Sequence, residues 1–134
     1  VWNSPERCPG IVNAGGRLSR PAEPVVRLAT WNVRWFPKGC SLEETCPGNE
    51  TDVDWLACTV TWMNVVLLAV QEILATDAAR NGMEEVITAL NRLTGGDWAV
   101  DLQECGGEDT QRVGFLWNRS RITLSRFADL PQLN

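Results

Sequence analysis

The 134-residue sequence contains no histidine and no tyrosine, and positively charged residues are few. Without histidine, the chain lacks the usual general base of hydrolytic enzymes and the commonest nitrogen ligand of metals. Twelve lysines and arginines against 17 aspartates and glutamates give a net charge of −5. This charge argues against the broad basic surface that binds nucleic acid non-specifically. It does not exclude a nuclease, because a metal in a cleft can supply local positive charge.

Long hydrophobic runs are also absent. The longest, residues 65–70, is far shorter than the ~20 residues that span a bilayer, and no segment resembles a signal peptide. The sequence begins with Val1 rather than methionine, which we interpret as a removed leader or a trimmed chain. With 44% hydrophobic and 22% charged residues, the composition is typical of one globular domain with a substantial core.

The five cysteines match no Cys-x-x-Cys metal-binding pattern, so a zinc site would need thiolates or carboxylates alone. Disulfides are the favoured use, since Cys40 and Cys46 bracket a loop that a small secreted protein would staple. Cys58 has apolar neighbours and is predicted to be a buried free thiol, whereas Cys8 and Cys105 have polar surroundings. The alternative is five reduced thiols in a cytoplasmic protein. An odd count leaves at least one cysteine free or bonded to another chain.

Proline and glycine in residues 1–24 predict an irregular N-terminal arm that wraps the domain and is ordered by Cys8. The remainder, residues 25–134, alternates between strand and helix patterns, which predicts a layered α/β arrangement. The predicted strands are 25–35, 65–73, 98–102 and 112–117, with a further strand considered at 121–127 and a turn at 106–109. The predicted helices run from a cap at Asp52 or Asp54 to near Asn64, and over 78–93 from a cap at Thr76 or Asp77 to Gly95 and Gly96.

Two of the predicted strands are read as buried and end in polar residues. Asn32 lies in Ala-Thr-Trp-Asn-Val-Arg-Trp-Phe, and Glu72 lies in Leu-Leu-Ala-Val-Gln-Glu-Ile. Adjacent parallel strands bring their carboxyl ends to one edge of a sheet, so the two side chains are expected to meet. A carboxylate is a natural ligand for Mg²⁺ or Mn²⁺, and a neighbouring asparagine can orient it or donate to a phosphate oxygen. The alternative is that Asn32 caps a turn and Glu72 is the first solvated residue after its strand.

Three phrases carry a family resemblance: Ala-Thr-Trp-Asn-Val-Arg at 29–34, Leu-Ala-Val-Gln-Glu-Ile at 68–73 and Gln-Arg-Val-Gly-Phe-Leu-Trp at 111–117. In this order they resemble the N-terminal half of the endonuclease/exonuclease/phosphatase superfamily, the deoxyribonuclease I-like fold. The resemblance covers roughly residues 25–127. It implies half of a four-layered α/β/β/α sandwich with a mixed sheet, in which residues 25–134 form the N-terminal half of the domain.

The resemblance also implies roles for individual residues. Glu72 is expected to bind the divalent metal, Mg²⁺ or else Mn²⁺ or Ca²⁺, and Asn32 to lie in the same metal and phosphate site, so both are candidate catalytic and metal-site residues. Arg112 could bind a phosphate of the substrate, although an arginine at a strand start is often simply solvated. The family usually has an aspartate early in the second strand, where this chain has Val65 and Val66. We interpret that departure as a packing change far from the site.

The larger departure from the superfamily pattern is that the C-terminal half of the domain is missing from this sequence. The resemblance implies a C-terminal half-domain that brings a histidine pair and further aspartate and asparagine residues, and this chain has no histidine. We expect that half to be a partner, as a cleaved chain or a further segment, and expect this chain alone to expose an apolar sheet face and to be inactive.

The predicted function is metal-dependent phosphoester hydrolysis by in-line attack of an activated water on phosphorus, in a secreted or periplasmic protein. The substrate could be DNA, RNA, a phospholipid or a small phosphate ester. The alternative is a non-catalytic descendant of the superfamily that serves as a binding or structural assembly subunit.

Overall fold

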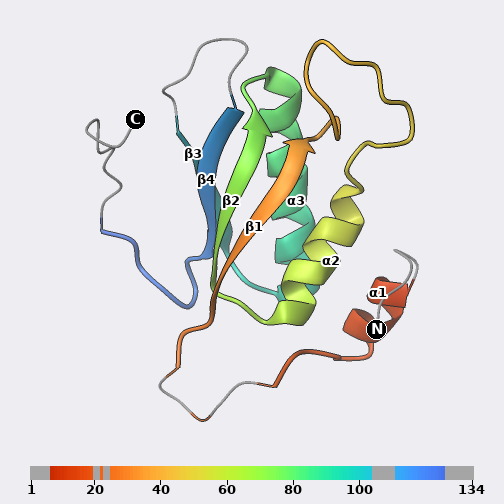
Figure 1. Cartoon of the computed structure of the whole chain (residues 1–134). Helices are drawn as coiled ribbons and strands as arrows, with labels where there is room; N and C mark the ends of the chain where they lie inside the picture. Colours follow the sequence, from red (N-terminus) through yellow and green to blue (C-terminus); the bar gives the residue numbers. More distant parts are fainter. Residues whose placement is uncertain (1–6, 20–21, 23–24, 104–110, 126–134) are drawn as a thin grey trace.

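The computed structural model describes residues 7–19, 22, 25–103 and 111–125. Helices and strands alternate along this part of the chain as far as β3, and β4 is the next element after it: α1 (Arg7–Asn13), β1 (Leu28–Phe36), α2 (Val53–Met63), β2 (Leu67–Leu74), α3 (Asp77–Thr94), β3 (Trp98–Leu102) and β4 (Gln111–Asn118). The strands form one sheet in the order β1-β2-β4-β3 (Figure 1). Strands β1 and β2 are parallel, and the other neighbours are antiparallel. The predicted α/β fold with a mixed sheet is confirmed.

Local sequence signals determine where the two longer helices begin and end. The Asp52 carboxylate accepts a backbone N–H of the first turn of α2 at 2.8 Å, and Asn64 ends this helix in the left-handed conformation. The Thr76 hydroxyl accepts a backbone N–H of α3 at 3.2 Å, and Gly95 ends that helix with a φ of 63°. Both predicted helices are confirmed, and Asp52 and Thr76 are the capping residues of the two pairs considered.

The four main strand predictions are confirmed, with ends displaced by up to three residues. The further strand considered at 121–127 is wrong for its described part, because residues 121–125 form no strand. There the chain turns instead: the Asn118 side chain accepts the Ser120 amide at 3.0 Å, and this turn ends β4. Residues 126–127 and the predicted turn at 106–109 lie outside the described residues.

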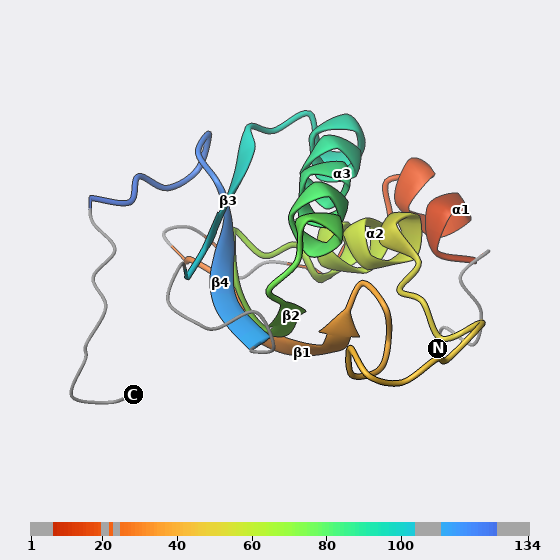
Figure 2. The ribbon, with the colours of Figure 1, turned by 90° about the horizontal axis from the view of Figure 1, so that it is seen from above.

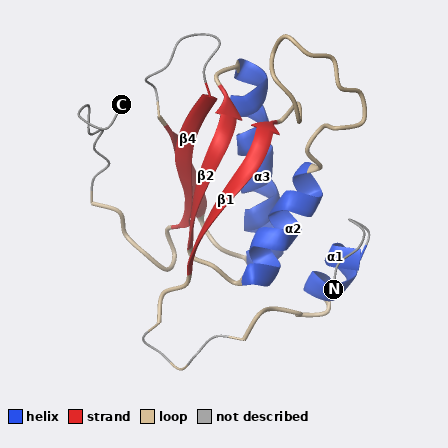
Figure 3. Cartoon of the chain, in the orientation of Figure 1, coloured by secondary structure: helices blue, strands red, loops and turns tan. Residues whose placement is uncertain are grey.

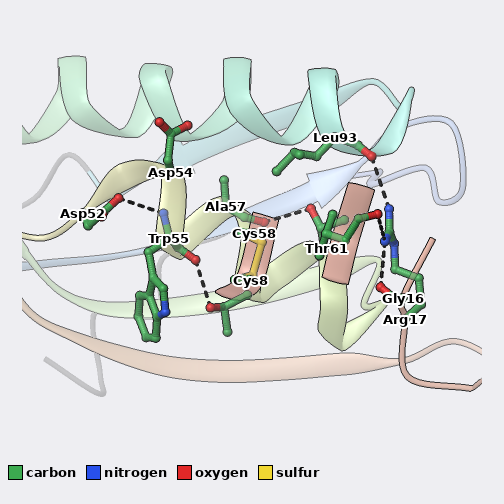
Figure 4. Close-up of a disulfide and its surroundings, with 12 residues drawn as sticks. Cys8, Gly16, Arg17, Asp52, Asp54, Trp55, Ala57, Cys58, Thr61 and Leu93 are labelled. Carbon is green, nitrogen blue, oxygen red and sulfur yellow. Dashed lines mark hydrogen bonds between the residues drawn. A yellow bond between two sulfur atoms is a disulfide. The ribbon is translucent and has the colours of Figure 1, made fainter. Parts of the chain in front are cut away.

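The N-terminal arm is not irregular throughout, because residues 7–13 form helix α1 (Figure 3). Pro9 lies in the first turn of α1, where a missing N–H costs no hydrogen bond. A disulfide joins Cys8 of α1 to Cys58 of α2, so Cys8 does anchor the arm (Figure 4). The prediction that Cys58 is a free thiol is therefore wrong. Its apolar surroundings are the contact with α1, and the two sulfurs are buried together.

The second predicted disulfide, between Cys40 and Cys46, is confirmed. Since four of the five cysteines are paired, the alternative of five reduced thiols does not hold. The fifth, Cys105, lies outside the described residues. Disulfides persist in oxidising compartments, so the pairing indicates an oxidising location.

The described helices all lie on one face of the sheet (Figure 2). Side chains on that face, such as Leu68 and Val70 of β2, are 1% exposed and pack in the core with α2 and α3. On the opposite face, Leu28 is 59% exposed and Val113 is 47% exposed. The prediction that β1 is buried along its length is therefore wrong, because its residues alternate between covered and exposed. The four-layered sandwich stays a prediction.

Candidate metal and phosphate site

The carboxyl-terminal parts of β1 and β2 form the candidate site. The strands do not end at Asn32 and Glu72 as predicted, because β1 continues to Phe36 and β2 to Leu74. The two parallel arrows point the same way and end side by side in Figure 1. In the register of this pair, Asn32 lies opposite Gln71, the residue before Glu72. The predicted meeting of Asn32 and Glu72 at one edge of the sheet therefore occurs. Both side chains are reachable from solvent, since Asn32 is exposed and Glu72 is half-buried.

A hydrogen bond joins the two predicted residues directly. The Asn32 Nδ2 atom donates to Glu72 Oε1 at 2.5 Å. The other end of the Asn32 amide is also held, because its Oδ1 atom accepts the Arg34 backbone N–H at 2.9 Å. Asn32 thus closes a local turn, as the alternative interpretation expected, and in the same geometry it fixes the orientation of the Glu72 carboxylate.

The backbone around Glu72 departs from regular strand geometry. Residues 33–35 of β1 oppose Glu72 alone, and Gln71 and Glu72 together oppose one residue of β4. In a regular strand, Glu72 would point to the face opposite Gln71, and a bulge changes that direction. Two of the opposing β1 residues and Glu72 have positive φ values, from 49° to 60°. Such conformations cost non-glycine residues about 1–3 kcal/mol and cluster at functional sites.

The strained conformation at position 72 gives a stability prediction. We expect the free energy of unfolding of the Glu72→Gly protein to be about 1 kcal/mol larger than that of the Glu72→Ala protein. The glycine variant should be the more stable one because glycine adopts a positive φ without a Cβ clash. Both variants lose the carboxylate and its hydrogen bond to Asn32, so the comparison isolates the backbone. Urea denaturation of the two variants measures the difference.

The matched control for that comparison is Ala69→Gly, in the regular part of the same strand. Here glycine should lower the free energy of unfolding by about 0.5–1 kcal/mol relative to alanine. If Glu72→Gly is no more stable than Glu72→Ala, the left-handed backbone at Glu72 is wrong.

A second polar pair lies beside the first and is not among the sequence predictions. Gln71 Nε2 donates to the Thr30 hydroxyl at 2.8 Å across the same strand pair. Thr30 and Asn32 alternate along β1, so both face the side of the sheet that the described helices leave uncovered. Both polar residues are visible in the sequence, but their pairing can be recognised only when the parallel register of β1 and β2 is known.

Arg112 is brought near the pair but not into contact with it. It lies opposite Ile73 in the β2–β4 register, one residue beyond Glu72. Ile73 belongs to the core beneath the helices. Because directly paired residues share a face of the sheet, the Arg112 side chain leaves the backbone on the face that the helices cover. Its Nε atom is buried and has no hydrogen-bond partner, and no hydrogen bond or ion pair joins the described Arg112 and Glu72. Its role as a substrate-binding residue stays a prediction.

A cavity of about 660 Å³ lies close to the same edge of the sheet, on the helix side. Its walls come from the loop after β1, the end of β2 and the start of α3, and include Lys38, Leu74 and Thr76. Neither Asn32 nor Glu72 lines it. The polar pair therefore lies on the open side of the sheet, where the described residues supply only one wall of a site.

The described residues of the candidate site supply some, but not all, of the oxygen ligands that a hard divalent cation needs. Mg²⁺ is commonly held by one or two carboxylates, with waters filling its other positions, and Glu72 can supply one carboxylate. Within the described residues, Glu72 belongs to no group of three histidine, cysteine or acidic side chains close enough to hold an ion. Asn32 directs its nitrogen at Glu72, so in this arrangement it orients the carboxylate.

Comparison with known proteins gives two relatives. The chain is 33% identical over 125 residues to the human protein named endonuclease/exonuclease/phosphatase family domain-containing protein 1, a match that covers 82% of this chain and 20% of that protein. It is 31% identical over 121 residues to the bovine protein of the same name, with the same coverage. The chain thus spans about a fifth of the length of these curated relatives. No protein-family profile and no solved structure matches it.

Proposed function

The chain is a distant member of the endonuclease/exonuclease/phosphatase family, and from this premise we propose that it supplies one half of a metal-dependent phosphoester hydrolase site. The hydrogen bond between Asn32 and Glu72 carries the proposal, because it holds a solvent-accessible carboxylate in one orientation at the edge of a sheet. In the proposed site Glu72 binds Mg²⁺, or else Mn²⁺ or Ca²⁺, and Asn32 orients it. When bound, the metal would offset negative charge on a phosphoryl group.

The backbone supports this role for Glu72. The two bulges that meet at Glu72 and the positive φ values around it cost stability, and they aim the carboxylate out of the sheet rather than into the core. A residue that was only the first solvated position after a buried strand would need neither the bulges nor the positive φ values. The geometry therefore favours a functional carboxylate over a solvated strand end.

The sheet face that the described helices leave uncovered supports the proposal of a partner half-domain. Along one cross-strand row, Leu28 pairs with Leu67, Leu67 with Trp117, and Trp117 with Ala99, so four apolar side chains share the face without a described helix. An apolar row of this kind is typical of a surface that another layer covers. We propose that a C-terminal half of the same domain packs there, and that it brings the remaining groups of the site, histidine included.

The proposed location is extracellular or periplasmic. Two disulfides fit an oxidising compartment, and no helix in the described part of the chain is both long and apolar enough to cross a bilayer. The substrate is proposed only as a phosphoester, which includes nucleic acid.

Metal binding by the chain itself tests the proposal without the second half. We expect Mn²⁺ to bind, and we expect Glu72→Gln to weaken that binding by at least about tenfold, because the amide cannot replace an anionic ligand. Asn32→Ala should weaken it by about 10–100-fold through loss of orientation. The decrease of the electron paramagnetic resonance signal of free Mn²⁺ measures the affinity.

Glu85→Gln is the matched control, since it removes an exposed carboxylate from α3 and should leave the Mn²⁺ affinity unchanged. Equal affinities in the wild type, Glu72→Gln and Glu85→Gln would remove Glu72 from the site. That result would favour the alternative of a non-catalytic binding or assembly subunit.

A further inference from the structure

A second group of potential metal ligands lies away from Glu72, in the loop between β1 and α2. The two sulfurs of Cys40 and Cys46 and a carboxylate oxygen of Glu44 all lie within 4.8 Å of one another. In the present state the two cysteines form a disulfide, whose Cα atoms are 6.4 Å apart. The loop is drawn in gold in Figure 1, where it leads from the carboxyl end of β1 to the start of α2.

The loop is held in place by bonds that do not depend on the disulfide. The Lys38 ammonium donates to the carbonyl oxygens of Ser41 and Leu42 at 2.9 and 2.8 Å. The Thr51 amide donates to the Pro37 carbonyl at 2.8 Å and closes the base of the loop. Opening the disulfide would therefore leave the two sulfurs near each other. Two sulfurs on a tetrahedral zinc ion are about 3.8 Å apart, so the required movement is small.

The carboxylate is oriented in advance. Glu44 Oε2 accepts the Ser41 hydroxyl at 2.9 Å and the Ser41 amide at 3.3 Å. These two bonds leave Oε1 without a hydrogen-bond partner in the described structure, and they resemble the outer hydrogen bonds that fix the ligands of metal sites. The chain has no histidine, so thiolates and carboxylates are its only strong zinc ligands.

The two disulfides differ in access to a reductant. Cys8 and Cys58 are 0% and 1% exposed, in the contact between α1 and α2. Cys46 is half-buried and lies in an exposed part of the loop, although Cys40 is buried. A small reductant should therefore open Cys40–Cys46 first.

We propose that Cys40, Glu44 and Cys46 form a zinc site when their disulfide is reduced. A thiol reductant transfers two electrons and two protons to the sulfur–sulfur bond, giving two thiols and an oxidised reductant. Zinc then displaces the two protons and binds both thiolates and the Glu44 carboxylate, with water as the fourth ligand. The same three residues thus hold no metal in the oxidised protein and one soft divalent cation in the reduced protein.

Co²⁺ is the probe for this site, because thiolate coordination gives a sulfur-to-cobalt charge-transfer band and tetrahedral geometry gives intense visible bands. The experiment uses the Cys105→Ser protein, so that the fifth cysteine adds no thiolate. After mild reduction with a phosphine, we expect one Co²⁺ to bind with both features and to be displaced by Zn²⁺. The oxidised protein should show neither feature. A carboxylate site at Glu72 gives no charge-transfer band, so the two sites are distinguished.

Variants and a blocking reaction make the test specific. Glu44→Gln should weaken Co²⁺ binding by at least about tenfold, whereas the matched control Glu43→Gln, one residue away and exposed, should not change it. Alkylation of the reduced Cys40 and Cys46 should abolish the bands without any substitution, and the masses of proteolytic peptides from the alkylated protein identify the opened disulfide. Absence of the bands in the reduced protein, their persistence after alkylation, or opening of Cys8–Cys58 first would overturn the proposal.

Discussion

Glu72→Gln should reduce Mg²⁺-dependent phosphodiester cleavage by about 100-fold or more, measured with the proposed second half-domain present. A metal ligand stabilises developing charge by several kcal/mol, and each 1.4 kcal/mol corresponds to about a tenfold change in rate. The substitution preserves the size of the side chain and can still accept from Asn32 Nδ2. The fold should therefore survive while the activity is lost.

The controls separate a lost ligand from a damaged fold. Glu85→Gln should keep full activity, and the denaturation midpoint of Glu72→Gln should stay close to that of the wild type. Asn32→Ala should reduce cleavage less than Glu72→Gln does, because Asn32 acts through the carboxylate it orients. Unchanged cleavage by Glu72→Gln would exclude Glu72 from catalysis, and absence of any Mg²⁺-dependent cleavage with the proposed second half-domain present would support the assembly-subunit alternative.

The elements of the fold could be predicted from sequence because their signals are local. The caps at Asp52 and Thr76, the glycine after α3 and the apolar run of β2 each depend on a few neighbouring residues. Helix α1 was missed because Pro9 and Gly10 read as breakers, whereas the disulfide to Cys58 supplies a long-range constraint that no local pattern contains. The pairing of Cys58 was missed for the same reason.

The candidate site also combines features that have a local sequence signal with features that depend on residues far apart in the sequence. The meeting of Asn32 and Glu72 follows from two strands that end together, and the sequence was sufficient for it. The bulges that turn Glu72 out of the sheet could not be predicted, because a left-handed glutamate has no sequence signal comparable to that of glycine. Cross-strand pairs such as Thr30 and Gln71 depend on register, which is a property of two strands together.

The two disulfides should differ in their contribution to stability. Cys8–Cys58 closes 50 residues of sequence and Cys40–Cys46 closes 6, so the chain-entropy model assigns about 4 and about 2 kcal/mol to them. We expect the Cys8→Ala/Cys58→Ala protein to lose about 2 kcal/mol more than the Cys40→Ala/Cys46→Ala protein, as measured by guanidinium denaturation.

The difference in burial between the two cysteine pairs should increase the same difference in stability that the chain entropy predicts. Cys8 and Cys58 lie in a small apolar cluster with Val12, which holds α1 on α2, so their removal also leaves unfilled space. The Cys40–Cys46 loop keeps its Lys38 bonds and the closure between Thr51 and Pro37 without the disulfide. Equal losses in the two double variants would mean that α1 contributes little to the stability of the folded domain. Because native domains are stable by only about 5–15 kcal/mol, a loss of 4 kcal/mol would make the docking of α1 a major determinant of the fold.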